Sequence, residues 1–455
     1  MTIINKKNIF SAIILMIILT SFINPYLPIL FILFCLFIYF KSNYYLIGFI
    51  TVISSFNGIL QIVEKNPIGT SIDTLISLFL ILKLVQVIIQ RKKFQINKNI
   101  LIAFTIMFLT IILSTLKTAL NYDLIYLSLA LKDFILPLSC FYYLYLITPT
   151  LSKNEKESIL KLFVLSITIV AGISLLNYLF NITDSFDRYV IASKFEGNED
   201  NAYTRTISGI EIIRMNSLFA LSTQAAPSVY YVMALILIYK YNWNTKSRII
   251  NTVCAILLVL AIFLSVSFSS IFTLFLFYIF YFLFKNIKSP KIILFPIISI
   301  ILISLLSMVE IESFGSNYNI IEYGYSNFIL KSLSGFEHID IIEVLIGFGV
   351  MPKLYLNEYL SVSDYNLYFR LVYDNWILGG FYQMGIIGLS LFFFILIAPI
   401  SYNLTSENNI IIVALLFSML GFSHGLFILD RLFIIKFCII YSLIANNNII
   451  FKGKV

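Results

Sequence analysis

Charged residues are scarce in this sequence of 455 residues: Asp, Glu, Lys and Arg make up 12% of it, against 60% hydrophobic residues. A soluble domain carries about 25% charged residues. Too few polar side chains therefore remain to coat a water-soluble globule. The apolar stretches are also continuous rather than alternating with polar residues, which excludes an outer-membrane barrel.

Histidine and cysteine are equally scarce, with two and four residues. The cysteines, Cys35, Cys140, Cys254 and Cys438, all fall inside apolar runs, so neither a disulfide framework nor a zinc site is indicated. The sequence contains no GxGxxG, P-loop, GxSxG or HExxH signature. We therefore expect no metal and no cofactor. The net charge of +8 does not indicate nucleic-acid binding, because the basic residues lie in short patches between apolar runs.

Long apolar runs are abundant, and many approach the roughly 20 residues that cross a hydrocarbon core. They lie at about 9–23, 27–40, 44–63, 72–90, 99–116, 124–148, 158–180, 216–239, 249–265, 268–284, 292–309, 377–400, 409–427 and 432–446. This pattern predicts an all-α fold, a polytopic transmembrane bundle of about fourteen helices (roughly twelve to fourteen), forming one integral membrane domain over 1–455. The first two runs could instead form a re-entrant hairpin. The serines of 265–270 divide the stretch 249–284, which is too long for one helix.

Basic residues are distributed unequally between successive loops. If the N-terminus is cytoplasmic, the inner loops are rich in Lys and Arg, whereas the short outer loops carry only Lys65, Lys117 and Arg431. This positive-inside pattern predicts a bacterial inner-membrane protein with both termini in the cytoplasm. Two long loops, 181–215 and 310–376, are then periplasmic, and most acidic residues lie there as well. The second loop is long enough to hold two or three short helices.

Two arginines stand where a long loop meets a helix. Arg214 ends the first loop, ahead of a polar stretch that contains Asn216 and Gln224, and Arg370 lies at the end of the second loop. The planar guanidinium binds phosphate oxygens in a bidentate way, and its charge does not titrate away. The pair therefore suggests an anion site on the outer face. Arg214 could alternatively only stop its helix at the lipid headgroups.

Few ionisable residues fall inside the apolar runs. Lys132 and Asp133 lie about 12 Å below the outer end of their helix, at about 1.5 Å per residue. They form either a structural ion pair or a polar floor under an outward-facing cavity. Lys83 is close enough to the basic patch 91–93 to snorkel toward the inner surface.

The second long loop ends in a series of glycine and polar motifs. It contains a bend, Gly347-Phe348-Gly349, and then many aromatic residues, which could anchor at the headgroup layer or stack on sugar rings. After Asp374-Asn375 come nine residues and then Gly385-Ile386-Ile387-Gly388. The glycines of this last motif make a bare strip that permits close approach of another helix.

This ordered set resembles the O-antigen polymerases of the Wzy type and, more distantly, the O-antigen ligases. In that family a late periplasmic loop runs through a Gly-x-Gly bend into a helix that opens with His or Asp plus Asn, nine residues and Gly-x-x-Gly. Arg214 matches the family's arginine ahead of a polar helix, and the serines of 265–270 match its Ser-rich helix start. The layout of spans covers nearly the whole chain. Ligases usually carry histidine where Asp374 stands, which favours a polymerase.

The resemblance implies a metal-independent membrane glycosyltransferase with a GT-C-like architecture. Its donor would be a glycan on undecaprenyl pyrophosphate, and its acceptor the non-reducing end of an incoming lipid-linked repeat unit. Arg214 and Arg370 would hold the pyrophosphate. Asp374 would be a general base, or would only cap its helix. The residues expected to contact substrate are Arg205, Asn216, Gln224, Lys132, Asp133, Asn375, Tyr373 and Trp376.

Other partners and functions stay open at this point. The expected partners are the lipid-linked oligosaccharide, the bilayer and a protein that sets chain length. The alternatives are an O-antigen ligase, which moves glycan to lipid A–core, and a flippase for lipid-linked oligosaccharides. A flippase would need several charges among the early helices, where Lys132 and Asp133 are the strong candidates.

Overall fold

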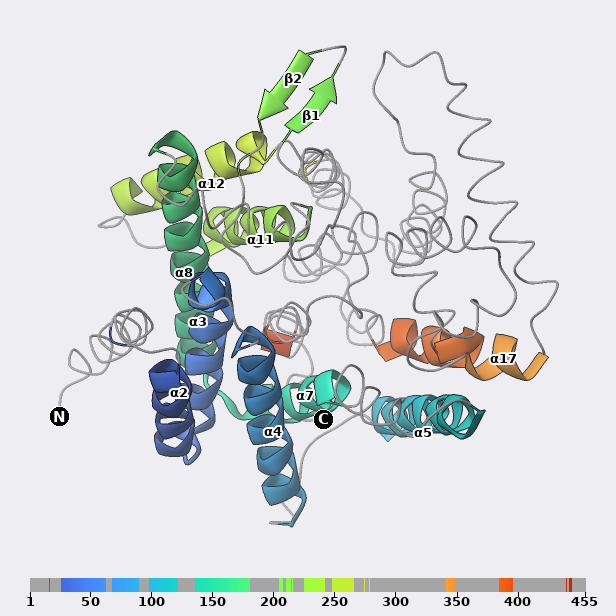
Figure 1. Ribbon diagram of the computed structural model, residues 1–455. Helices are drawn as coiled ribbons and strands as arrows, with labels where there is room; N and C mark the ends of the chain where they lie inside the picture. Colours follow the sequence, from blue (N-terminus) through green and yellow to red (C-terminus); the bar gives the residue numbers. More distant parts are fainter. Residues whose placement is uncertain are drawn as a thin grey trace, which may run out of the picture.

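The computed structural model of the chain describes residues 26–62, 68–89, 98–121, 136–180, 204–207, 210–213, 225–241, 248–265, 341–347 and 384–395, together with single residues such as Met215 and Leu443. These residues are helical apart from one short hairpin (Figure 1). The elements are α2 (Tyr26–Tyr39), α3 (Asn43–Ile62), α4 (Ile68–Ile89), α5 (Lys98–Asn121), α7 (Leu136–Ile147), the 3-10 turn η2 (Thr148–Thr150), α8 (Lys153–Phe180), β1 (Thr204–Ile207), β2 (Ile210–Ile213), α11 (Ala225–Tyr241), α12 (Arg248–Leu264), α17 (Ile341–Ile346) and the helix Met384–Ile395.

The helices follow the apolar runs of the sequence closely. α2 and α3 coincide with the predicted runs 27–40 and 44–63 to within one residue at each end. α12 ends at Leu264, and Ser265 is in a turn, so the predicted division of the stretch 249–284 at its serines is confirmed on the N-terminal side. The predicted runs 9–23, 292–309 and 409–427 lie outside the described residues apart from Met16, so the total number of spans stays a prediction.

The start of α8 shows why this helix is longer than its apolar run. The Ser152 backbone N–H donates to Glu155 Oε2 at 2.8 Å, and the Glu155 N–H donates to Ser152 Oγ at 3.3 Å. This reciprocal pair is a capping box, which satisfies backbone donors that the first turn of a helix leaves without intrahelical partners. The helix therefore begins at Lys153, before the apolar run at 158.

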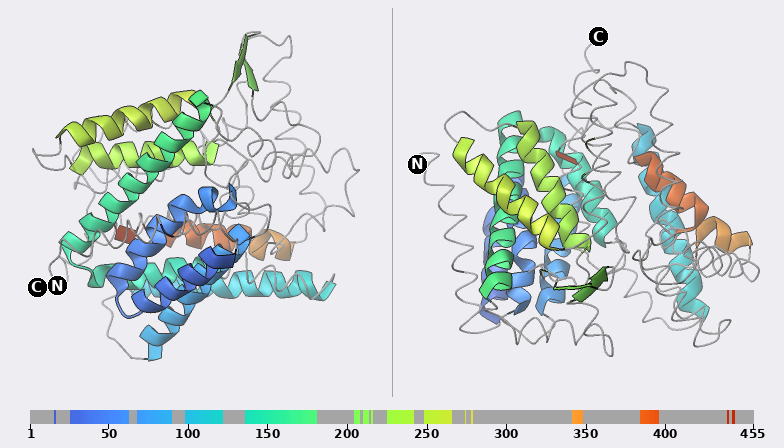
Figure 2. Two further views of the ribbon diagram at one scale, coloured as in Figure 1. Left: turned by 60° about the vertical axis from the view of Figure 1, so that its left-hand side comes forward. Right: turned by 90° about the horizontal axis from the view of Figure 1, so that it is seen from above.

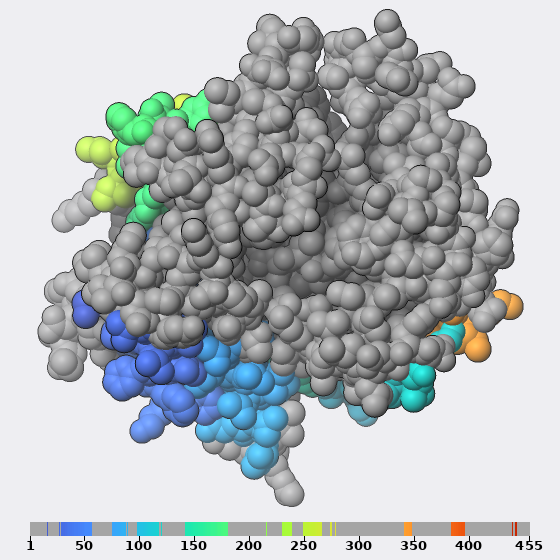
Figure 3. Space-filling view, viewed as in Figure 1, coloured from blue at the N-terminus to red at the C-terminus, as the bar shows by residue number. Residues whose placement is uncertain are grey.

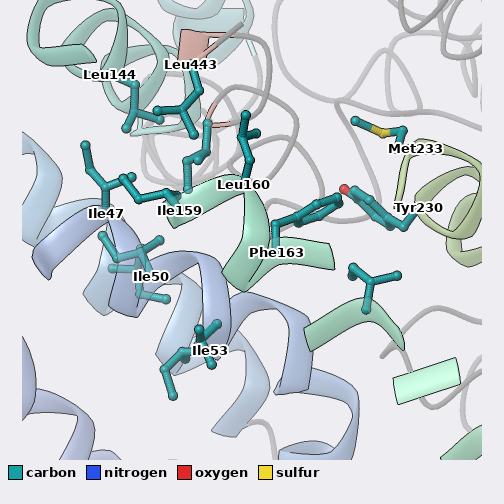
Figure 4. Close-up of a cluster of buried hydrophobic side chains, with 14 of the residues drawn as sticks. Ile47, Ile50, Ile53, Leu144, Ile159, Leu160, Phe163, Tyr230, Met233 and Leu443 are labelled. Atoms are coloured by element: carbon teal, nitrogen blue, oxygen red, sulfur yellow. The ribbon is translucent and has the colours of Figure 1, made fainter. Parts of the chain in front are cut away.

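α8 is the centre of the larger group of helices. It packs against α3, α11 and α12, while α2 and α4 pack against α3, and α7 packs against α4 (Figures 1 and 2). Figure 4 shows isoleucines of α3 and side chains of α8 facing one another, with Tyr230 of α11 beside Phe163. The rings of Phe163 and Tyr230 are 6.2 Å apart between centroids and meet edge to face, a favourable geometry for aromatic pairs.

A second group consists of α5, α17 and the helix Met384–Ile395. The helix Met384–Ile395 runs beside α5 in each view, and α17 lies at its end (Figures 1 and 2). α17 packs against α5. The two are also neighbours on the molecular surface, where α17 is orange and α5 cyan (Figure 3). In Figure 1 the helices of this group run across the direction of α8. α17 falls within the second long loop predicted at 310–376.

Apolar side chains cover the outer faces of these helices. On α5 an exposed stripe repeats every three or four residues: Ile102, Ile106, Leu109 and Leu113 are between 43% and 56% exposed. Leaving one such side chain in water instead of burying it costs roughly 1.5–3 kcal/mol. Two helices of the described part, Lys98–Lys117 within α5 and Lys153–Phe180, are long and apolar enough to cross a membrane. The stripes are what such helices would present to lipid.

Polar side chains, in contrast, lie inside the bundle. α8 buries Ser166, Thr168, Ser174 and Asn177. Several buried hydroxyls are satisfied by their own helix: Thr168 Oγ1 donates to the carbonyl of Val164 at 2.8 Å, an arrangement that requires no water. The buried hydroxyls of Thr115 and Ser442 are exceptions, because they have no hydrogen-bond partner among the described residues.

Lys83 joins α4 to the end of α2. The residue is buried, and its Nζ donates to the backbone carbonyl of Phe40, next to the predicted inner loop at Lys41. The ammonium also lies 4.6 Å from the centroid of the Phe40 ring. A cation at the last carbonyls of a helix is stabilised by the helix dipole. The predicted reach toward the inner surface stays open, and the head group ends on a helix terminus.

The hairpin β1–β2 is a feature that the all-α prediction did not include. Its strands pair antiparallel with Ile207 opposite Ile210, so two residues connect them. The sequence signal is a Ser208-Gly209 pair between runs rich in Ile and Thr, which favours a two-residue turn. The hairpin lies within the first long loop predicted at 181–215.

Candidate functional site

The end of the first long loop is fastened to the end of α12. The backbone N–H of Met215, directly after Arg214, donates to the carbonyl of Leu264 at 2.8 Å, and Met215 is fully buried. Ser265 follows at once, and its Oγ donates to the carbonyl of Ile262 at 2.7 Å. The structure thus brings together the chain beside Arg214 and the first serine of the 265–270 series, two segments that the family pattern names separately.

A second junction joins the Gly-x-Gly bend to the start of the helix Met384–Ile395. Gly347 ends α17 with φ of +80°, and its N–H donates to the carbonyl of Glu343 at 2.7 Å. Gly385 also has a positive φ, +65°. A Cβ at Gly385 would lie 2.3 Å from the Leu345 carbonyl oxygen and 2.5 Å from the Gly347 nitrogen. Only glycine accommodates this backbone approach without displacement.

The two glycines of the Gly-x-x-Gly motif have different surroundings. Gly385 is the one that another segment approaches closely, which confirms close approach for this half of the motif. At Gly388 an added Cβ would meet only Met384 of its own helix, 2.5 Å from Met384 Cβ. The bare strip at Gly388 stays a prediction, whereas close approach at Gly385 is observed.

The contact at Gly385 has a direct consequence for the second long loop. Because Gly347 and Gly385 touch, the described residues on either side of the segment 348–383 meet at one place. That segment carries Arg370, Asp374 and their neighbours in the sequence. Its start and its finish are therefore held together by the contact between the two glycines.

An ion pair holds the same junction from the side of α5. Lys117 Nζ donates to Glu343 Oε1 at 2.7 Å, and the side chains are 33% and 1% exposed. Glu343 lies one turn before Gly347 on α17. A carboxylate removed from water to this extent requires a charged or hydrogen-bonding partner. The pair therefore ties α17, and with it the end of the segment 348–383, to α5.

Most of the predicted site residues lie outside the described residues. This holds for Asp374, Arg214, Arg370, Asn216, Gln224, Lys132, Asp133, Asn375, Tyr373 and Trp376. Arg205 is in β1, where its backbone pairs with Ile212 of β2. What the structure shows is how the segments beside these residues are fastened. The hairpin and the end of α12 lie apart from α17 in each view, so the two junctions are separate (Figures 1 and 2).

Sequence reasoning assigned no role to Lys117 and Glu343. Lys117 counted only as one of three basic residues in the short outer loops, although α5 continues beyond it to Asn121. A signal for the pair does exist, because Glu343 is the single charge in the apolar hexapeptide Ile341–Ile346. A lone acid in such a segment calls for a cation nearby, but the sequence does not say which one.

The described residues contain no group of three or more His, Cys, Asp or Glu side chains that could hold a metal ion. No protein-family model, curated protein or solved structure matches the chain. Any functional conclusion therefore depends on the residues themselves, on the two junctions and on the pattern that links them.

Replacement of Gly385 by alanine should destabilise the protein. The substitution forces a Cβ into the Leu345 carbonyl and holds an L-residue at φ of +65°, at a cost of about 2 kcal/mol or more. The measurement is thermal unfolding of the purified protein in detergent. Gly172→Ala on α8 is the matched control, because an added Cβ there meets nothing within 4 Å. It should be neutral or stabilise by up to about 1 kcal/mol. Equal unfolding temperatures for the two variants would contradict the close approach.

Proposed function

We propose that the protein is an integral membrane glycosyltransferase that polymerises lipid-linked O-antigen repeat units. It transfers the growing glycan from undecaprenyl pyrophosphate to the non-reducing end of an incoming lipid-linked unit at the periplasmic face. The observation that carries this proposal is the contact of Gly347 with Gly385. It joins two members of the family's ordered pattern, the Gly-x-Gly bend and the Gly-x-x-Gly motif, and this juxtaposition supports the proposal.

The first junction supports the same proposal independently. In the family pattern an arginine precedes a polar helix, and a Ser-rich helix start lies elsewhere in the chain. The hydrogen bond from Met215 to Leu264 brings these two segments together. The guanidinium of Arg214 suits phosphate oxygens, whereas the hydroxyl of Ser265 is already donated to the carbonyl of Ile262. A segment of roughly 35 residues, 348–383, can reach tens of ångströms out and back at about 3.3–3.6 Å per residue. We propose that it carries Arg370 and Asp374 to Arg214.

The proposed chemistry is a displacement at the anomeric carbon of the donor glycan. A hydroxyl oxygen of the acceptor's terminal sugar forms the new bond, and the bond from the anomeric carbon to the pyrophosphate oxygen breaks. The pyrophosphate leaves with the electron pair, and Arg214 and Arg370 stabilise its charge. Asp374 accepts the proton of the attacking hydroxyl as a general base. The remaining expected contacts, from Arg205 to Trp376, would orient the two glycans.

The contacts between helix ends support the proposed sidedness. Lys117 and Glu343 both fall on the outer side in the alternation of loops, and the structure pairs them at 2.7 Å. Tyr44 and Ser158 both fall near the inner side, and their hydroxyls are hydrogen-bonded at 2.9 Å. Each pair therefore supports an even number of spans between its two members, as the alternation of loops predicts, while the positive-inside pattern assigns the side.

The wider architecture belongs to the proposal. It consists of about fourteen helices, roughly twelve to fourteen, in a GT-C-like arrangement with two long periplasmic loops. The proposed location is the bacterial inner membrane, with both termini in the cytoplasm. The partners are the undecaprenyl-pyrophosphate-linked oligosaccharide, the surrounding lipid and a protein that sets chain length. The exposed apolar stripes of the described helices support the lipid surroundings.

The alternatives differ in the residues that they need. A ligase of the same family would carry histidine at the position of Asp374. A flippase would line an inner path with charges. The buried charged residues of the described part are Lys83, Lys156 and Glu343. Lys83 is bonded to a helix end, Lys156 lies in the first turn of α8, and Glu343 lies in a short loop helix. None of the three lines the middle of a long helix, which favours the polymerase.

Removal of either proposed anion-binding arginine should abolish long glycan chains. Arg214→Ala and Arg370→Ala should each reduce the ladder of chain lengths on a lipopolysaccharide gel to about one repeat, because no other fixed cation replaces the lost charge. Arg370→Lys should retain part of the activity, since lysine supplies charge without bidentate contact. Arg188→Ala, in the same first loop, is the control and should leave the ladder unchanged. Normal ladders from the Arg214 and Arg370 variants, at native protein levels in the membrane, would overturn the anion site.

Asparagine at position 374 separates the two roles of Asp374. The amide caps a helix about as well as the carboxylate does, but it cannot accept the proton of the attacking hydroxyl. Asp374→Asn should therefore leave the unfolding temperature in detergent nearly unchanged and reduce polymerisation about 100-fold or more, the usual contribution of a general base. Native polymerisation by this variant would restrict Asp374 to helix capping.

A further inference from the structure

The ion pair between Lys117 and Glu343 is more than a surface contact. Glu343 is 1% exposed and Lys117 is 33% exposed, with 2.7 Å between Nζ and Oε1. The pair joins residues far apart in the sequence, Lys117 near the end of α5 and Glu343 in the second long loop. The pair lies one turn of α17 away from the contact at Gly385.

α17 cannot depend on its own helical propensity. It has six residues, and isolated helices shorter than about 12–15 residues are marginal in water. Two of its isoleucines, Ile341 and Ile342, are largely exposed. The helix is therefore held in place by its contacts, and these are the packing on α5, the salt bridge and the backbone approach of Leu345 and Gly347 to Gly385.

We infer that Lys117 and Glu343 are positioning residues, which dock α17 on α5 and so fix the closed ends of the segment 348–383. This inference rests on the proposed function for its catalytic part, since Arg370 and Asp374 lie in that segment. The docking itself is independent of any activity. Neither residue touches the reacting groups. They act indirectly, because they hold the point at which the segment 348–383 begins and ends.

Because Glu343 is buried and Lys117 is partly exposed, loss of the lysine should destabilise the docking of α17 more than loss of the glutamate. Lys117→Met leaves the buried carboxylate without its lysine, which is the expensive half of a broken pair. Glu343→Leu leaves a half-exposed ammonium that water can solvate, and it adds an apolar side chain to an apolar helix. The double variant removes both charges and should resemble Glu343→Leu. Lys117→Arg keeps the charge and should behave like the native protein.

The experiment measures amide hydrogen exchange in peptides that cover 341–347, by mass spectrometry of the full-length protein in detergent. Lys117→Met should accelerate exchange about tenfold or more, because the bond from the Gly347 N–H to the Glu343 carbonyl opens when α17 undocks. Glu343→Leu, the double variant and Lys117→Arg should change it much less. Lys98→Met is the matched control: Lys98 is the exposed first residue of α5, and its loss should change nothing.

The same variants are then compared on a lipopolysaccharide gel. Lys117→Met should shorten the glycan ladder, and the addition of Glu343→Leu should restore it, a rescue that simple loss of a structural residue does not give. Native exchange at 341–347 in Lys117→Met would overturn the docking role. Accelerated exchange with a native ladder, in a strain where Arg370→Ala abolishes the ladder, would overturn the positioning role. If Arg370→Ala leaves the ladder native, the proposed function fails instead, while the exchange data still decide the docking.

Discussion

The backbone approach at Gly385 is the constraint on which the candidate site depends. The carbonyl of Leu345 and the nitrogen of Gly347 occupy the space where any other residue at 385 would place its Cβ. Both glycines use positive φ to make the contact possible. This contact brings residues 347 and 385 together, so the two ends of the segment between them share a common base. The salt bridge from Lys117 to Glu343 attaches that base to α5.

The described helices carry polar side chains on their inner faces and apolar side chains on their outer faces. Ser, Thr and Asn side chains of α8 are buried, while large aliphatic side chains of α5 and α8 are exposed. Hydroxyls such as that of Thr168 bond the preceding turn of their own helix, which is what a medium without water demands. The buried ammonium of Lys83 likewise donates to a backbone carbonyl, that of Phe40 at the end of α2. The scaffold can therefore present polar loops at its ends while its sides stay apolar.

Much of the scaffold could be predicted from hydropathy alone. The bounds of α2, α3 and α12 follow the apolar runs, and the serine at 265 marks the end of α12 as the sequence suggested. The capping box at Ser152 is also legible in the sequence, and it explains why α8 begins at Lys153, before the apolar run at 158. The hairpin β1–β2 was missed because a membrane reading of hydropathy ignores the Ser-Gly turn signal in a loop.

The candidate site could be predicted only in part. Glycine spacing pointed to Gly347 and Gly385 but not to their mutual contact, because two positive φ values in separate segments carry no pairing information. The partner of Glu343 could not be found from the sequence, since a salt bridge between distant residues depends on tertiary packing. Local sequence patterns therefore identify individual residues of the site, but tertiary packing determines which of them are in contact.

The most direct test of the account is the lipopolysaccharide of a strain from which this gene has been deleted, separated by gel electrophoresis. Loss of a glycan polymerase leaves the supply and the attachment of repeat units intact, so the account predicts lipid A–core carrying a single repeat and no longer chains. Reintroduction of the native gene should restore the ladder. Unattached polymer on its lipid carrier would indicate a ligase, and precursors retained in the cytoplasm would indicate a flippase. Either of these results, or an unchanged ladder, would contradict the account.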